Sequence, residues 1–186
     1  LSEVAAENDM MIACESLRPQ ESLIGWRIDQ IKHLFDEVNH PNFKVMIDLT
    51  AMSVAGETIQ QWFDTFGTEN IIHSHFQDCN PYGHFVWGDG NRNLKQDILD
   101  MLNNGYTGKF TQELTDGKYF ADPFYHDKRN IFIHSFSRSS NKHLLNFYYA
   151  TWCFKHSICV NSFSLILWTR HLNSLHCTNK ETEAKR

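Results

Sequence analysis

The stretch "IIHSHFQD", residues 71–78, is an apolar run that contains two histidines two positions apart. Side chains of a β-strand alternate between the two faces of its sheet, so a strand here places His73 and His75 on the same face. The run ends at Asp78, and a loop that contains Gly and Pro follows. A buried strand with two imidazoles on one face indicates that this part of the sheet has a chemical role.

The same arrangement of an apolar strand-like run, a turn and a helical stretch occurs four times along the chain. The predicted strands are residues 10–16, 43–49, 70–78 and 109–116. The predicted helices are residues 22–38, 53–66 and 94–104, and a last one after Pro123.

Apolar spacing and capping residues set the predicted limits of the helices. Leu23 and Trp26 begin the apolar face of the first helix. Ser53 is the expected N-terminal cap of the second helix, and Gly67 is its expected stop.

Alternating strands and helices are typical of a parallel sheet with crossover helices, an α/β fold. A complete (β/α)8 TIM barrel takes about 250 residues, so residues 1–137 correspond to about half of one. We therefore predict an incomplete barrel of about four βα units. The alternative is an open doubly wound sheet, which usually has a Gly-rich turn after its first strand. No such turn follows residues 10–16, and "GDG" at residues 88–90 follows no strand directly.

Composition divides the chain into two regions. Residues 1–137 carry 10 Lys and Arg against 20 Asp and Glu, whereas residues 138–186 carry 7 against 2. The second region has no Gly or Pro, and Lys155 and His156 interrupt its apolar run, which makes it a poor membrane span. We expect residues 138–186 to be an atypical tail, disordered or non-native.

Charge and cysteine content limit the classes of partner. The formal charge of −5 favours neither a nucleic acid nor an anionic membrane. The five cysteines form no CxxC pair, which indicates reduced thiols and a cytoplasmic location. The chain does not begin with Met, so we expect a fragment. Half a barrel has two open sheet edges, and these leave a homo-oligomer open as an alternative.

Each predicted strand ends near a group that can bind a metal ion. These groups are Glu15, Asp48, His75 or His73, and Glu113. The carboxyl ends of the strands meet at one rim of a βα barrel. Three carboxylates and one imidazole suit Mn²⁺, Co²⁺ or Mg²⁺ and leave room for substrate oxygens. A single carboxylate is more often a helix cap, but the coincidence at four strands predicts a metal site.

These residues resemble the C-terminal half of the sugar isomerase/epimerase barrels of the xylose isomerase-like superfamily. The matching segments are "ACESL", "MIDLTAM", "HSHFQD" and "TQELT", and their ligand positions are 33, 27 and 38 residues apart. The loop of residues 75–91 and the segment 113–123 are most similar to the fructoselysine 3-epimerase group. The resemblance covers about residues 8–136 and does not extend into the tail.

The resemblance implies a metal-dependent isomerase that acts on a small-molecule sugar, next to the carbonyl of a ketose or ketose derivative. It implies Glu15, Asp48, His75 and Glu113 as the ligands of a divalent ion. His75 fits the family spacing better than His73. Glu15 and Glu113 would also move the proton, one removing it and the other returning it from the opposite face.

Three further residues are predicted to bind substrate or to support the site. Glu21 matches a family position that contacts the substrate, or it supplies negative charge to the N-terminus of the next helix. His73 is either a partner of the metal site or a packed core residue. His84 lies in the loop after the third strand, where it either contacts substrate or is solvated.

Two positions depart from the family pattern. Ala51 stands where epimerases of the psicose and tagatose type usually have His, and Pro81 stands where they tend to have Arg. Both departures favour a substituted or phosphorylated ketose over a free ketohexose. The alternatives are an inactive barrel fragment and an endonuclease-like barrel of the same superfamily, which the acidic charge of residues 1–137 disfavours.

Overall fold

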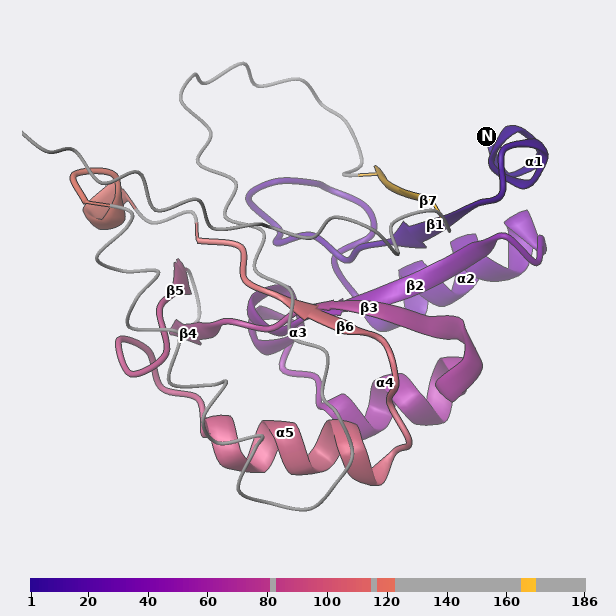
Figure 1. Cartoon of the computed structure of the whole chain (residues 1–186). Coiled ribbons are helices and arrows are strands. Elements are labelled where there is room, and N and C mark those ends of the chain that lie inside the picture. Colours follow the sequence, from indigo (N-terminus) through magenta and orange to yellow (C-terminus); the bar gives the residue numbers. More distant parts are fainter. Residues whose placement is uncertain (81–82, 115–116, 123–164, 170–186) are drawn as a thin grey trace, which may run out of the picture.

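The structure is a computed structural model that describes residues 1–80, 83–114, 117–122 and 165–169. A five-stranded sheet in the order β6-β3-β2-β1-β7 organises this part of the chain (Figure 1). Its strands are β1 (Met10–Cys14), β2 (Phe43–Asp48), β3 (Ile71–His75), β6 (Lys109–Thr111) and β7 (Leu165–Thr169). The strands β1, β2, β3 and β6 are parallel neighbours in chain order, which confirms the predicted series of βα units.

Helices connect the parallel strands and cover one face of the sheet, as α2, α4 and α5 show in Figure 1. The helices are α1 (Ser2–Glu7), α2 (Ile28–Val38), α3 (Leu49–Val54), α4 (Ile59–Phe66) and α5 (Leu94–Asn103), with short 3-10 helices η1 (Thr68–Asn70) and η2 (Gly117–Tyr119).

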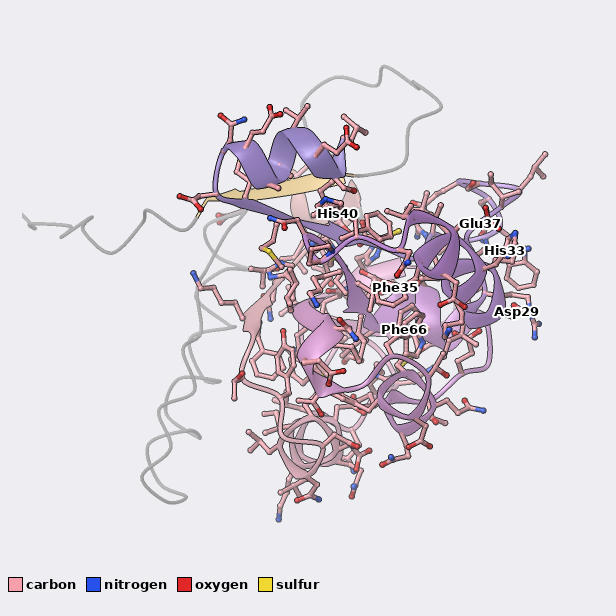
Figure 2. The ribbon with its side chains drawn as sticks, turned by 90° about the vertical axis from the view of Figure 1, so that its right-hand side faces the viewer. Asp29, His33, Phe35, Glu37, His40 and Phe66 are labelled. Atoms are coloured by element: carbon pink, nitrogen blue, oxygen red, sulfur yellow. The ribbon has the colours of Figure 1, made fainter. Side chains whose placement is uncertain are left out.

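Alternation along the strands directs apolar side chains toward these helices. Val45 and Ile47 of β2 are fully buried in this core. Phe35 of α2 and Phe66 of α4 join the two helices edge to face, with ring centroids 5.6 Å apart. Figure 2 shows both rings between the helices and His33 on the outer side of α2. The opposite face of the sheet is therefore left for the polar residues of the strands.

The first predicted helix begins later than its apolar spacing suggests. Residues 17–27 form a loop, which is closed by a hydrogen bond from the Leu17 N–H to the Gly25 carbonyl (2.9 Å). Gly25 has a φ of +76°, a left-handed conformation that a right-handed helix cannot contain. Leu23 is 90% exposed, so the prediction that Leu23 and Trp26 begin the helix is wrong.

The second predicted helix is divided into α3 and α4. The break includes Gly56, which has a φ of +72°. Thr58 caps α4 through a capping box with Gln61, so the expected cap at Ser53 is wrong. The Ser53 hydroxyl instead donates to the Leu49 carbonyl inside α3 (2.6 Å). The expected stop at Gly67 is confirmed.

The third predicted strand ends at His75 rather than at Asp78. The chain turns at Phe76 and Gln77 and then forms an antiparallel hairpin of β4 (Asp78–Asn80) and β5 (Gly83–Phe85). The sequence analysis assigned this hairpin to a loop. The hairpin lies beyond the carboxyl ends of the parallel strands (Figure 1), where β4 contacts α3.

Of the predicted tail, residues 138–186, the structure describes only β7, which pairs antiparallel with β1. The sequence analysis predicts no strand there. The rest of residues 138–186, like the helix predicted after Pro123, lies outside the described residues, so the division of the chain at residue 137 stays a prediction. Across the described ranges, every helix is too short or too polar to cross a membrane.

Candidate metal centre

Four side chains from neighbouring strand ends converge on the face of the sheet opposite the helices. Asp48 ends β2 and pairs in register with His75, which ends β3. Glu15 directly follows β1, and Glu113 follows β6. One ligand atom from each of the four residues lies within 4.8 Å of the others. The structure therefore brings together the complete predicted ligand set.

His75 lies at the middle of this cluster. Its Nδ1 is 2.6 Å from Glu15 Oε1, 3.2 Å from Glu113 Oε2 and 3.4 Å from Asp48 Oδ2. Burial lowers the pKa of His75, but the three carboxylates hold this pKa well above its usual range, so a proton on this imidazole balances part of their charge when no ion is bound. A nitrogen that faces three carboxylates also lies where a ligand to a cation would lie.

Burial makes the negative charge of the cluster costly without a cation. Asp48 is 1% exposed, and burial raises the pKa of Glu15 to about 7, with further increases from the charges of Glu113 and Asp48 and a decrease from His75. Burial also disfavours the charged form of Asp48, but His84 and His75 outweigh it and hold the Asp48 pKa well below its usual range. A divalent ion would neutralise this charge and satisfy the donor set.

The site is open on the side of Glu113, whose side chain is 37% exposed. The other two carboxylates, Glu15 and Asp48, are buried. Such an arrangement leaves Glu113 accessible to a small molecule while Glu15 and Asp48 stay shielded from bulk water.

His84 lies at the centre rather than in solvent. It belongs to β5 and is buried, with its Nε2 3.3 Å from Asp48 Oδ2 and 3.6 Å from Glu113 Oε2. Burial lowers the pKa of His84, but the charge of Asp48, its hydrogen bond and the charge of Glu113 together raise this pKa above its ordinary value. The hairpin thus brings a second imidazole to the carboxylates.

His73 packs behind His75 and does not belong to the ligand cluster. Its ring lies edge to face with that of His75, with centroids 5.6 Å apart, and its Nε2 is 3.0 Å from Thr111 Oγ1. Burial, together with the charge of His75, lowers the pKa of His73 to about 3, so this imidazole is neutral. His73 supports the ring of His75 from within the sheet.

Glu21 lies in the loop of residues 17–27 and does not begin a helix, because α2 starts only at Ile28. It accepts a hydrogen bond from the Arg18 N–H (2.9 Å) and forms an ion pair with the Arg18 guanidinium. Arg18 interacts electrostatically with Asp48, and Glu21 with His84, so this loop borders the centre. The sequence analysis did not identify Arg18, whose role depends on how the loop folds.

Asp78 holds the loop that follows the hairpin. Its carboxylate accepts hydrogen bonds from four backbone N–H groups at 2.8–2.9 Å, those of Cys79, Gly88, Gly90 and Arg92. A side chain at Gly90 would collide with this carboxylate. The "GDG" segment therefore serves to wrap the backbone around Asp78, and it keeps the hairpin and His84 in place.

The chain belongs to the xylose isomerase-like TIM barrel family, which matches residues 1–131. This membership confirms the predicted fold class, an incomplete (β/α)8 barrel. Two curated relatives are the fructoselysine 3-epimerases of Escherichia coli O157:H7 and Shigella flexneri. Each is 29% identical over 125 residues, which cover 66% of this chain and 45% of the relative. The chain therefore spans less than half the length of these relatives.

Solved structures show the same fold. A D-psicose 3-epimerase from Clostridium cellulolyticum H10, solved with D-tagatose, superposes with a TM-score of 0.54 at 22% identity, covering 67% of this chain and 47% of that one. A D-tagatose 3-epimerase-like protein gives 0.56 at 18% identity, with coverage of 74% and 53%. Coverage of about half of each barrel agrees with the four parallel βα units.

Proposed function

We propose that this chain carries the metal-binding half of a sugar epimerase or isomerase that acts next to the carbonyl of a ketose derivative. The observation that supports it most is the convergence of Glu15, Asp48, His75 and Glu113 within 4.8 Å. The family membership supports an isomerase, because the curated relatives are sugar epimerases.

The four convergent residues would hold Mn²⁺, Co²⁺ or Mg²⁺. Such an ion supplies positive charge that stabilises the anion formed when a proton leaves the carbon next to a carbonyl. Glu15 and Glu113 are the proposed proton carriers, one taking the proton and the other returning it on the opposite face of that carbon.

Neighbouring polar residues would orient the substrate. His84 presents an imidazole beside Asp48, and the loop that carries Arg18 and Glu21 borders the same centre. Ala51 has only a methyl side chain and donates its backbone N–H to Asp48 Oδ1 (2.7 Å), so this position supplies no polar group for a substrate. We propose a substituted ketose, such as an amine-linked one, and a cytoplasmic location.

The test measures metal binding first and proton exchange second. The purified chain is expected to bind Mn²⁺ and to exchange a substrate proton for deuterium in D₂O with a ketose or a fructosamine, followed by NMR. Glu113→Gln and His75→Ala should each reduce the bound metal. Glu37→Gln, an exposed carboxylate on α2 (Figure 2), is the matched control and should bind like the unaltered chain.

Two outcomes would contradict the proposal in different ways. Unchanged metal content in both site variants would refute the metal centre. Metal binding without exchange on any ketose or fructosamine would contradict the proposed activity and identify an inactive barrel fragment.

A further inference from the structure

Gln77 lies in the turn that follows β3 and joins this turn to the end of β2 and the first turn of α3. Its side chain is fully buried, at 0% exposure. Its Nε2 donates to Asp48 Oδ2 at 2.8 Å and to Thr50 Oγ1 at 3.0 Å. A buried amide therefore donates a hydrogen bond to one of the proposed metal ligands.

The orientation of this amide is determined by its two acceptors. An ionised carboxylate only accepts hydrogen bonds, so the nitrogen rather than the oxygen of the amide faces Asp48. The second N–H is used by Thr50. The remaining Oε1 is buried and has no hydrogen-bond partner in the described ranges. Turning the amide over would place Oε1 against the carboxylate, so the arrangement has one stable form.

The contact fixes the plane of the Asp48 carboxylate from two sides. Oδ1 accepts from the Ala51 N–H at 2.7 Å, and Oδ2 accepts from Gln77. The same Oδ2 lies 3.4 Å from His75 Nδ1 and 3.3 Å from His84 Nε2. Two donors outside the centre thus leave the remaining side of Oδ2 directed toward the other ligands.

We propose that Gln77 is a positioning residue that orients Asp48 Oδ2 for the ion, an inference that rests on the proposed metal centre. Groups that hydrogen-bond to metal ligands fix the ligand geometry, and their loss typically weakens metal affinity 10–100-fold. Gln77 acts on the ion only through Asp48. Its effect should therefore depend on the Asp48 carboxylate.

The test compares the Mn²⁺ dissociation constants of the full chain and its variants by titration calorimetry. Gln77→Met keeps the approximate volume and removes both hydrogen bonds, so we expect Kd to rise about 10–100-fold. Gln96→Met is the matched control, because Gln96 donates to Asp100 at 2.7 Å on the exposed face of α5. Its Kd should equal that of the unaltered chain.

A double substitution separates positioning from a general structural effect. In an Asp48→Asn background, Gln77→Met should change Kd further by less than about twofold, because the group that Gln77 positions is already altered. The electron paramagnetic resonance spectrum of bound Mn²⁺ should differ between the unaltered chain and Gln77→Met. An equal weakening with and without Asp48 would overturn the inference.

The possible failures can be told apart. If the unaltered chain binds no Mn²⁺, the proposed function itself fails. If the unaltered chain binds and Gln77→Met binds equally well, only this inference is overturned. Should Gln77→Met not fold, Thr50→Val removes one acceptor of the amide and should raise Kd by a smaller factor, and an unchanged Kd would be the contrary result.

Discussion

His73 is a buried neutral imidazole, and this makes the stability of the chain depend on pH. Its pKa in the folded chain is about 3, below the ordinary value near 6.5, so the unfolded chain binds more protons at its position. Stability from this residue is complete above about pH 6.5 and is lost as the pH falls toward 3. His73→Gln should remove this dependence. Between pH 7.5 and 5, urea unfolding should show the unaltered chain losing up to about 2 kcal/mol more than the variant.

If the unaltered chain lost less stability than His73→Gln between pH 7.5 and 5, His73 would not be a neutral imidazole in the folded chain. A matched control is His33→Gln, because His33 lies exposed on the outer side of α2 (Figure 2). That variant should follow the unaltered chain at both pH values.

Residues at strand ends were predictable because their position depends only on the alternation of the strands. The convergence of Glu15, Asp48, His75 and Glu113 follows from the parallel register once the strands are identified. Gln77 was not predictable in the same way. Its contact with Asp48 depends on the path of the turn after β3, and no periodicity reports that path. Roles that rest on loop conformation therefore remain hidden at the level of sequence.

At the scale of elements, Asp78 is expected to hold the β4–β5 hairpin and the loop after it. Asp78→Asn replaces one carboxylate oxygen by an NH₂ group, which faces two backbone N–H donors instead of accepting from them. We expect a loss of about 3 kcal/mol in the free energy of unfolding, measured with urea, because hydrogen bonds to charged groups contribute about 1.5–3 kcal/mol each. Amide hydrogen exchange at Gly88 and Gly90 should also become faster.

Asp64→Asn, an exposed substitution on α4, provides the comparison and should change stability by less than about 0.5 kcal/mol. If the amides of Gly88 and Gly90 exchanged at the same rate in Asp78→Asn as in the unaltered chain, Asp78 would not hold this loop in place.

The limits of the helices show which local signals outweigh apolar spacing. Leu23 and Trp26 fall at helical spacing by chance, whereas Gly25 requires a left-handed turn. The capping box of Thr58 and Gln61 was present in the sequence as a Thr-x-x-Gln pattern and marks the true start of α4. Glycine and capping residues thus define these boundaries better than periodicity does.

At the scale of the whole molecule, a bound ion would connect the ends of all four parallel strands. Because it binds the folded chain and not the unfolded one, Mn²⁺ at 100 times its Kd should raise the free energy of unfolding by about 2.7 kcal/mol. Urea unfolding with Mn²⁺ and with excess EDTA measures this difference. His75→Ala lacks the imidazole at the middle of the cluster and should show little gain, while Glu37→Gln should match the unaltered chain. Equal stability with and without Mn²⁺ would mean that these strand ends do not share an ion, however closely their side chains lie.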